Sequence, residues 1–200
     1  MSKALEMARE LVRQLEEAER ENKVQLSELE PGETFKIGDN DFIVLEHTDD
    51  GTKVISKGFM KENVAFDNDT RDYNQSHLKS VIEEEIQPLI EQEVGSENLV
   101  EHIVDLTSVD MQNEFGECRC KVRPITFDEA RRYNNFLPNK DLDDCWWTCT
   151  PWSTEERGYA YSITVVSSYG DFDYRGRFRD DFGVRPVCVL KSNIFVSKGE

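Results

Sequence analysis

The stretch YGDFDYRGRFRDDFGVRPVCVL, residues 169–190, joins two kinds of sequence. Residues 183–190 end in a run of apolar, largely β-branched side chains, which is typical of a buried strand. The part before them alternates charged residues with aromatic residues and glycine. Glycine interruptions favour loops, and loops held on a rigid scaffold are where binding residues concentrate. The stretch therefore predicts a structural strand with a candidate binding surface beside it.

Arginines are concentrated in this stretch although the formal net charge of the chain is −17. In an extended conformation Phe172, Tyr174 and Phe178 would face one way and the neighbouring charged side chains the other. Arg185 stands beside the apolar strand, so we expect it to be buried against a carboxylate or loop carbonyl groups. Tyrosine and arginine are favoured at protein interfaces. The predicted binding residues are Tyr169, Phe172, Tyr174, Arg175, Arg177 and Arg179.

Apolar alternation on both sides of the GDND turn, 38–41, predicts two strands, and residues 49–58 continue as a third. Further strands are predicted at residues 98–106 and in three aromatic and β-branched runs, at residues 145–152, 159–166 and 183–190. These strands occur toward both ends of the chain with helices between them. The sequence therefore predicts an α+β fold, with residues 25–200 as a single domain.

Two helices are predicted between the strands. Ser76 can cap a helix whose apolar residues share one side, and Pro88 must kink or restart that helix. Thr126 and Glu129 form the pattern of a capping box ahead of a second, shorter helix. The apolar residues of the first helix are Leu78, Val81, Ile82, Ile86, Leu89 and Ile90.

An amphipathic helix is predicted at the N-terminus, within residues 1–24. Its apolar stripe includes Leu5, Leu11 and Leu15, and charges cover the remaining faces. The stripe is too short to be stable alone, so it must be buried against the domain itself or against a second copy of the chain. Docking on the domain is favoured because the alanines of the stripe suit close packing better than they fill a coiled-coil seam.

Net acidity is confined to the first part of the chain. Between Ser80 and Glu117 there are 11 carboxylates and no lysine or arginine. Such a field would repel nucleic acid or imitate it, so we expect no direct nucleic-acid binding. The alternatives are an ordinary acid-rich surface and mimicry of DNA toward a host nuclease. The predicted acidic surface consists of Glu83, Glu84, Glu85, Glu91 and Glu93.

The sequence carries no catalytic signature and predicts no catalytic residue, cofactor or metal. Its cysteines, Cys118, Cys120, Cys145, Cys149 and Cys188, lack the usual zinc-knuckle spacing, so buried thiols are favoured over a zinc site. The three histidines, His47, His77 and His102, have no local partner motif. An aspartate cluster at residues 67–72 lacks the glycine and distal glutamate of a calcium loop, and a solvated turn is favoured.

The first 20 residues are crowded with charge, unlike a signal peptide, and no run of residues approaches the length of a membrane span. The odd number of cysteines favours reduced thiols over a disulfide framework. We therefore expect a cytoplasmic protein that does not bind membranes.

An ordered series of motifs resembles an uncharacterised domain family of Gram-positive bacteria and their prophages. The motifs are YNxSxL from Tyr73, TFDEA from Thr126, WWTCTPW from Trp146 and the final GVRPVCVL. The same ending is similar to the C-type lectin-like fold of relatives of the formylglycine-generating enzyme. The resemblance implies a lectin-like α+β fold and a binding role.

The chain departs from these families in ways that exclude their chemistry. Thr148 and Cys149 stand where the domain family has a Leu-Arg pair. The EPN and WND calcium motifs of sugar-binding lectins and the paired catalytic cysteines are absent. The expected function is a non-enzymatic protein-binding module of phage or prophage origin that uses its C-terminal loops. The alternatives are an acidic inhibitor of a nucleic-acid-handling defence enzyme, of the anti-CRISPR or anti-restriction type, and a metal-dependent hydrolase or oxidase.

Overall fold

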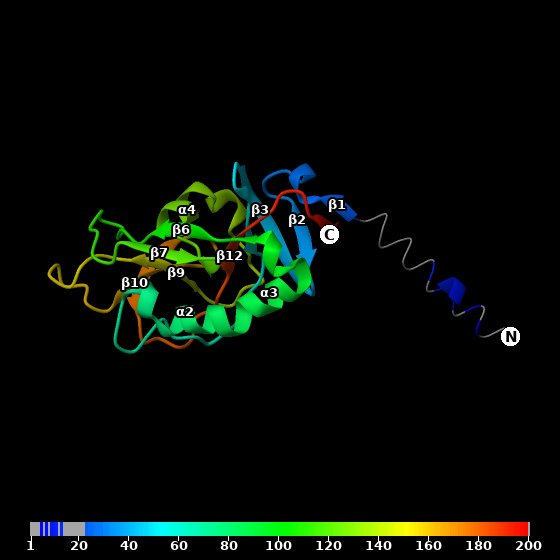
Figure 1. Cartoon of the computed structure of the whole chain (residues 1–200). Coiled ribbons are helices and arrows are strands. Elements are labelled where there is room, and N and C mark those ends of the chain that lie inside the picture. The colour runs from blue at the N-terminus through cyan, green and yellow to red at the C-terminus, as the bar shows by residue number, and fades with distance from the viewer. Residues whose placement is uncertain (1–4, 6, 8, 12, 14–22, 200) are drawn as a thin grey trace.

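An eight-stranded antiparallel sheet organises the computed structural model, which describes residues 5, 7, 9–11, 13 and 23–199 (Figure 1). The first and last strands pair with one another at one edge. In spatial order the strands are β1 (Lys23–Gln25), β13 (Phe195–Lys198), β2 (Thr34–Ile37), β3 (Asn40–Thr48), β4 (Gly51–Ser56), β12 (Pro186–Leu190) and β5 (Leu99–Val100), and β8 (Val122–Pro124) also pairs with β12.

Two smaller antiparallel sheets accompany the large one. The three-stranded sheet has β10 at its centre and carries the tryptophan motif on β9. The two-stranded sheet is a hairpin. Their strands are β9 (Trp146–Pro151), β10 (Ser162–Val166) and β11 (Phe172–Gly176) in the first, and β6 (His102–Asp105) and β7 (Glu117–Cys120) in the second.

Both faces of the central strands are buried, each in its own hydrophobic cluster. Along β3, Phe42 and Val44 belong to one cluster while Ile43 and Leu45 belong to the other. This division follows from the two-residue period of a strand, which sends successive side chains to opposite faces. Continuous apolar runs in the sequence therefore mark strands that are covered on both sides.

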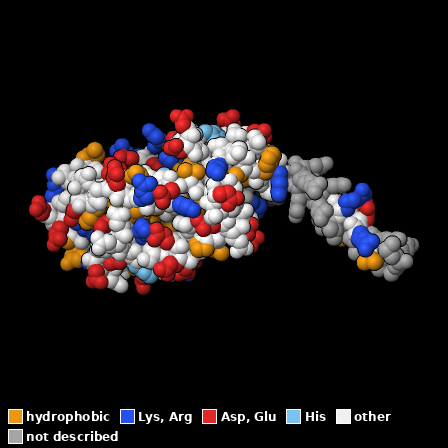
Figure 2. Space-filling view, viewed as in Figure 1, with side chains coloured by type: hydrophobic (Ala, Val, Ile, Leu, Met, Phe, Trp, Pro, Cys, Tyr) orange, Lys and Arg blue, Asp and Glu red, His pale blue; other side chains and the backbone are white. Residues whose placement is uncertain are grey.

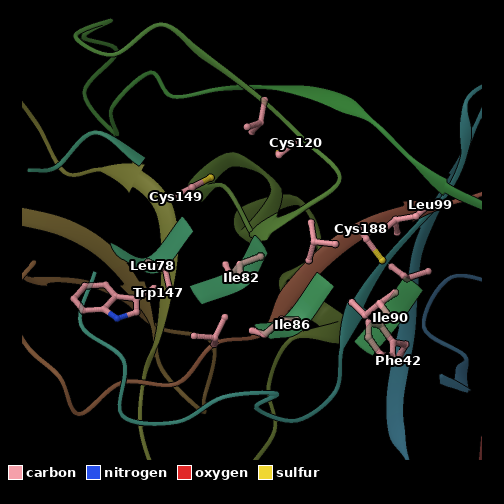
Figure 3. Packing of buried hydrophobic residues seen from close by; sticks show 14 of the residues in the cluster. Phe42, Leu78, Ile82, Ile86, Ile90, Leu99, Cys120, Trp147, Cys149 and Cys188 are labelled. Carbon is pink, nitrogen blue, oxygen red and sulfur yellow. The ribbon is translucent and has the colours of Figure 1, made fainter. Parts of the chain in front are cut away.

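A long helical segment covers one face of the large sheet. It consists of α2 (His77–Val81), a π-helical turn (Ile82–Ile86) and α3 (Gln87–Val94). The Ser76 side chain caps the start, accepting a hydrogen bond from the Lys79 amide at 3.1 Å. Apolar side chains at a spacing of four residues, such as Ile82, Ile86 and Ile90, pack toward strand residues including Phe42 and Cys188 (Figure 3).

The π-helical turn directly precedes Pro88. Proline has no amide hydrogen, and in a regular helix its ring would clash with the carbonyl group four residues earlier. The wider turn brings the Gln87 amide to the Ile82 carbonyl group, and a regular helix resumes at Gln87. Of the two predicted alternatives, that Pro88 kinks or restarts the helix, the structure shows a restart after the π-helical turn.

Helix α4 (Phe127–Arg132) packs against the second cluster through Ala130. Its predicted capping box is confirmed, because the Thr126 hydroxyl accepts from the Glu129 amide and the Glu129 carboxylate accepts from the Thr126 amide. Short 3-10 turns complete the helical structure. They are η1 (Leu26–Glu28), η2 (Tyr73–Gln75), η4 (Ser96–Asn98) and η5 (Asn134–Phe136).

The α+β prediction is confirmed at the level of class. Residues 98–106 form two strands rather than the single predicted one, since β5 pairs with β12 and β6 pairs with β7. The sheet already begins at Lys23, two residues before the predicted domain start. The N-terminal helix prediction lies largely outside the described residues, among which Leu5 and Leu11 are exposed. In the part of the chain that the structure describes, no helix has the length and apolar character needed to cross a membrane.

Candidate functional site

The predicted binding segment forms strand β11 and the loop after it. Tyr174 lies on β11 and contacts the ring of Trp152, with ring centroids 4.8 Å apart, and that of Tyr159 at 5.7 Å. Tyr161 and Phe178 form a second pair at 6.3 Å. We call these five residues the aromatic edge. Tyr161, Tyr174 and Phe178 are 58%, 41% and 55% exposed, so aromatic surface is presented to solvent here.

Two of the predicted binding aromatics lie apart from the aromatic edge. Phe172 is half-buried and packs on Phe127 at the start of α4, with ring centroids 5.1 Å apart. Tyr169 is exposed on the turn between β10 and β11, the turn where the Gly170 carbonyl group accepts a hydrogen bond from Asn134. The structure therefore brings only Tyr174 of the predicted aromatic binding residues into the aromatic edge.

The predicted separation of aromatic and charged faces fails after Gly176, where β11 ends. Arg177 turns inward: it is buried, lies 5.3 Å from the Tyr161 ring centroid and donates to the Asp67 carbonyl group. Phe178 is exposed instead. An alternating pattern requires a continuous strand, and the chain leaves the extended conformation at this point.

Two of the remaining arginines of the segment have neighbouring counter-charges. Arg175 pairs with Asp173, and Arg179 pairs with Asp181. Arg185 is fully buried, as predicted, and donates to the carbonyl groups of Ser56 at 2.9 Å and Leu137 at 2.7 Å. Of the two alternatives for Arg185, the structure shows the carbonyl contacts.

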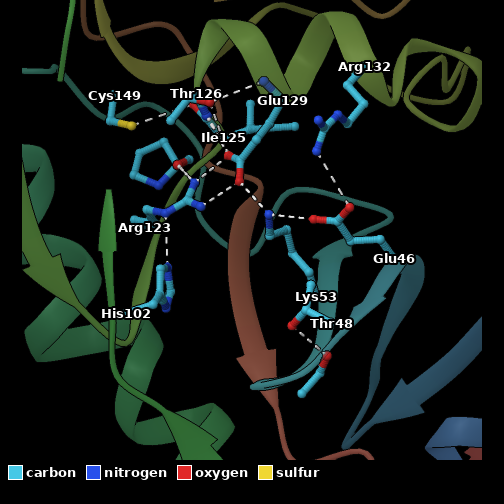
Figure 4. Close-up of polar contacts among 12 residues, drawn as sticks. Glu46, Thr48, Lys53, His102, Arg123, Ile125, Thr126, Glu129, Arg132 and Cys149 are labelled. Carbon is cyan, nitrogen blue, oxygen red and sulfur yellow. Dashed lines mark hydrogen bonds and ion pairs between the residues drawn. The ribbon is translucent and has the colours of Figure 1, made fainter. Parts of the chain in front are cut away.

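A second candidate site lies at the start of α4, where Glu129 joins two cations from different strands (Figure 4). Its carboxylate accepts two hydrogen bonds from Arg123, both at 2.7 Å, and lies 3.0 Å from the Lys53 ammonium group. Lys53 also pairs with Glu46 at 2.8 Å, and Arg123 donates to His102 at 3.0 Å. We call these five residues the Glu129 network.

The electrostatics of the Glu129 network keep its charges fixed near neutral pH. Burial alone would raise the pKa of Glu129, but the Arg123 guanidinium and Lys53 more than offset it and hold the pKa well below its usual range. Burial and then the positive charge of Arg123 lower the pKa of His102 to about 4. His102 is therefore neutral, and its Nε2 accepts from Arg123 while Nδ1 faces the Val100 carbonyl group.

A cleft of about 700 Å³ opens above the Glu129 network. Strand β6 forms one wall of this α4 cleft, and the start of α4 forms the other. Ile103 and Met111 expose apolar surface at its border, being 54% and 75% exposed. Two carboxylates also line the cleft: Asp50 from the turn between β3 and β4, and Asp105 from the end of β6. No local sequence motif marks this cleft, because its parts are distant in the chain.

The predicted acidic surface is largely neutralised by cations from outside residues 80–117. Glu83 pairs with Lys79, Glu85 with Lys61 and Glu91 with Lys121. Glu84 and Glu93 are exposed and have no ion pair among the described residues. Figure 2 accordingly shows acidic and basic side chains interspersed over this face of the body.

The cysteines are mostly buried, whereas the histidines differ: His77 is exposed, and the rings of His47 and His102 make hydrogen bonds. Four of the cysteines are buried and Cys145 is half-buried, all as free thiols. No group of three or more His, Cys, Asp or Glu side chains among the described residues is arranged to hold a metal ion. His47 links the Leu29 carbonyl group to the Thr52 hydroxyl, both at 2.8 Å. In the 67–72 turn, Asp67 accepts from the amides of Asp69 and Thr70.

No family model, curated protein or solved structure matches this chain.

Proposed function

We propose that the chain is a non-enzymatic protein-binding module that contacts its partner through the aromatic edge. The observation that carries the proposal is the ring cluster of Trp152, Tyr159 and Tyr174, continued by the exposed pair Tyr161 and Phe178. Tyrosine and tryptophan are enriched among the residues that dominate binding energy at protein interfaces. Rings that already contact one another lose little conformational freedom when a partner covers them.

The sequence motifs support two further parts of this proposal. The ordered series from Tyr73 to Leu190 supports a C-type lectin-like fold and an origin in a phage or prophage. The odd number of cysteines, all free, supports action in the cytoplasm. A lectin-like scaffold that presents a binding surface on its C-terminal loops needs neither a cofactor nor a catalytic group.

A double substitution at the aromatic edge tests the proposal. Tyr174→Ala with Phe178→Ala removes two exposed rings and leaves the buried core intact, so thermal unfolding should stay nearly unchanged. Capture of partners from host lysate, followed by mass spectrometry, should lose its specific partner in this variant. The control is Tyr169→Ala, which removes a still more exposed ring, at 69%, outside the cluster and should retain capture. Equal capture by a folded double variant would overturn the proposal.

A further inference from the structure

Strand β6 has an unpaired backbone edge that faces the α4 cleft. Leu106, the residue after β6, donates its amide to the Gly116 carbonyl group at 2.9 Å. This bond shows which residue pairs of the β6–β7 ladder are hydrogen-bonded. Because bonded and non-bonded pairs alternate in an antiparallel ladder, His102 and Val104 bond to β7. The amide and carbonyl groups of Ile103 and Asp105 therefore point away from β7. Those groups have no hydrogen-bond partner among the described residues.

The lining of the α4 cleft shows which side this edge faces. All four residues of β6 line the cleft, whereas no residue of β7 does. The opposite wall is formed by residues 126–129 at the start of α4, so the open edge of β6 looks across a trough toward a helix. A four-residue strand is about 13 Å long, which matches a short extended peptide.

The charges around the cleft specify what kind of peptide it suits. The cations that line the cleft, Lys53, Arg123 and Arg131, are each paired with a carboxylate, from Glu46, Glu129 and Asp128 respectively. Asp50 and Asp105 are exposed carboxylates without an ion pair in the described part of the chain. A bound segment therefore meets uncompensated negative charge, which favours lysine or arginine side chains.

The apolar lining supplies the second half of the specificity. Val104 and Val189 line the inner side of the cleft and are buried, and Ile103 is exposed at its border. Met111 holds a positive φ of 64° at the tip of the β6–β7 loop, with its side chain 75% exposed. That loop is anchored, since Asp110 accepts from Ser153 at 2.6 Å. An anchored loop presents apolar surface without an ordering cost.

We infer that the α4 cleft binds an extended peptide segment with alternating basic and apolar residues, which adds as a strand to the open edge of β6. Main-chain hydrogen bonds to Ile103 and Asp105 hold the segment, apolar side chains cover Val104 and Val189, and basic side chains lie near Asp105 and Asp50. Strand addition of this kind takes affinity from the backbone and specificity from alternate side chains. The inference does not depend on the aromatic edge.

A synthetic peptide, acetyl-Thr-Lys-Val-Arg-Val-Lys-amide, tests the inference with the full-length protein. Isothermal calorimetry should detect saturable binding, and hydrogen exchange of the Ile103 and Asp105 amides should slow when the peptide is present. Two matched peptides serve as controls. One replaces each basic residue by glutamate, and the other carries N-methyl groups on alternate amides, which removes the hydrogen-bond donors. Each should bind at least about tenfold more weakly, the equivalent of one hydrogen bond to a charged or backbone group.

Two protein variants separate the backbone and charge contributions. Ile103→Pro removes one donor from the open edge without breaking a β6–β7 hydrogen bond, since proline is accepted on the free side of an edge strand. It should keep the unfolding midpoint near that of Ile103→Ala but bind the peptide about tenfold more weakly than Ile103→Ala does. Asp105→Asn should weaken binding of the basic peptide and reduce its salt dependence. Absence of peptide binding, or binding unaffected by N-methylation and by Ile103→Pro, would overturn the inference. The peptide results do not depend on the aromatic edge: the variant Tyr174→Ala with Phe178→Ala should bind the peptide as the wild type does, so the two proposals can fail separately.

Discussion

Arg123 and Glu129 form a bidentate ion pair in which both nitrogen to oxygen distances are 2.7 Å and the side chains are only 3% and 14% exposed. The pair connects β8 to the first turn of α4. The same glutamate completes the capping box with Thr126 and reaches Lys53 on β4. One carboxylate therefore fixes the position of α4 against two strands of the large sheet.

Replacing Glu129 should be strongly destabilising. Glu129→Gln removes the charge that neutralises the buried Arg123, and breaking a buried pair in this way costs about 3 kcal/mol in the free energy of unfolding. Urea denaturation at pH 7 measures this loss. The matched control is Asp128→Asn, one residue earlier on the exposed side of α4, which should change stability by less than about 0.5 kcal/mol.

The pH dependence of the same variant follows from the lowered pKa of Glu129. Because the folded-state pKa lies below the ordinary value of 4.5, the stabilisation is complete above pH 4.5 and is lost as the pH falls through the folded-state value. The stability difference between the wild type and Glu129→Gln should therefore be constant from pH 7 to 5 and narrow in more acidic solution. A difference that narrows already near neutral pH would contradict this assignment.

His102 should make the protein less stable in mildly acidic solution. Its pKa is about 4 in the folded state and 6.5 when unperturbed, so the unfolded chain takes up a proton first as the pH falls below 6.5. Between pH 7.5 and 5 the wild type should lose about 1–2 kcal/mol more stability than His102→Gln. An NMR titration of the His102 ring gives a direct check, because its signals should not move above pH 5. A titration midpoint near 6.5 would refute the prediction.

Arg185 should be irreplaceable even by lysine. Its guanidinium spans two carbonyl groups and lies 4.4 Å from the Trp146 ring centroid, an arrangement that a lysine ammonium group cannot reproduce. Arg185→Lys should cost about 2 kcal/mol, and Arg185→Met about 3 kcal/mol because it leaves both carbonyl groups buried without a donor. Denaturant titration measures both variants. Equal stability of Arg185→Lys and the wild type would show that the planar guanidinium group is not needed.

Thiol reactivity should distinguish Cys145 from the other cysteines. Cys145 is only half-buried, whereas the other four thiols are buried away from the reagent. That burial holds even for Cys118, whose pKa is lowered by its hydrogen bond with Cys120, and it raises the pKa of Cys149 and of Cys188 to about 12. Ellman's reagent should modify one thiol per folded chain and all five after unfolding in guanidinium. Burial also raises the pKa of Cys145, so its reaction should be slower than that of a free thiol. Cys145→Ser should abolish the phase seen with the folded protein.

Features that depend on neighbouring residues could be predicted from the sequence. The caps at Ser76 and Thr126, the restart at Pro88 and the strands around the GDND turn each involve residues only a few positions apart. The burial of Arg185 also follows from its position beside a continuous apolar strand. In these cases local conformational preference and the final tertiary structure agree.

Features that depend on contacts between distant segments could not be predicted. Arg177 is buried because it reaches Asp67, which lies 110 residues earlier. The role of Glu129 as the centre of an ion network depends on Lys53, and the neutralisation of Glu91 depends on Lys121. Charge counts within one segment cannot show which cations the fold will place beside it.

The π-helical turn before Pro88 makes the number of residues in this helical segment depend on whether residue 88 is proline. A π-helical turn holds one residue more than the regular helix it interrupts, and here that residue gives the proline ring room. Deleting a single residue between Ile82 and Ile86 would restore a regular helix and drive Pro88 into the preceding turn. Substitution of Pro88 alone would leave a wide turn that nothing requires. The deletion should therefore be tolerated only together with substitution of Pro88, so we expect a relative that is one residue shorter here to lack this proline.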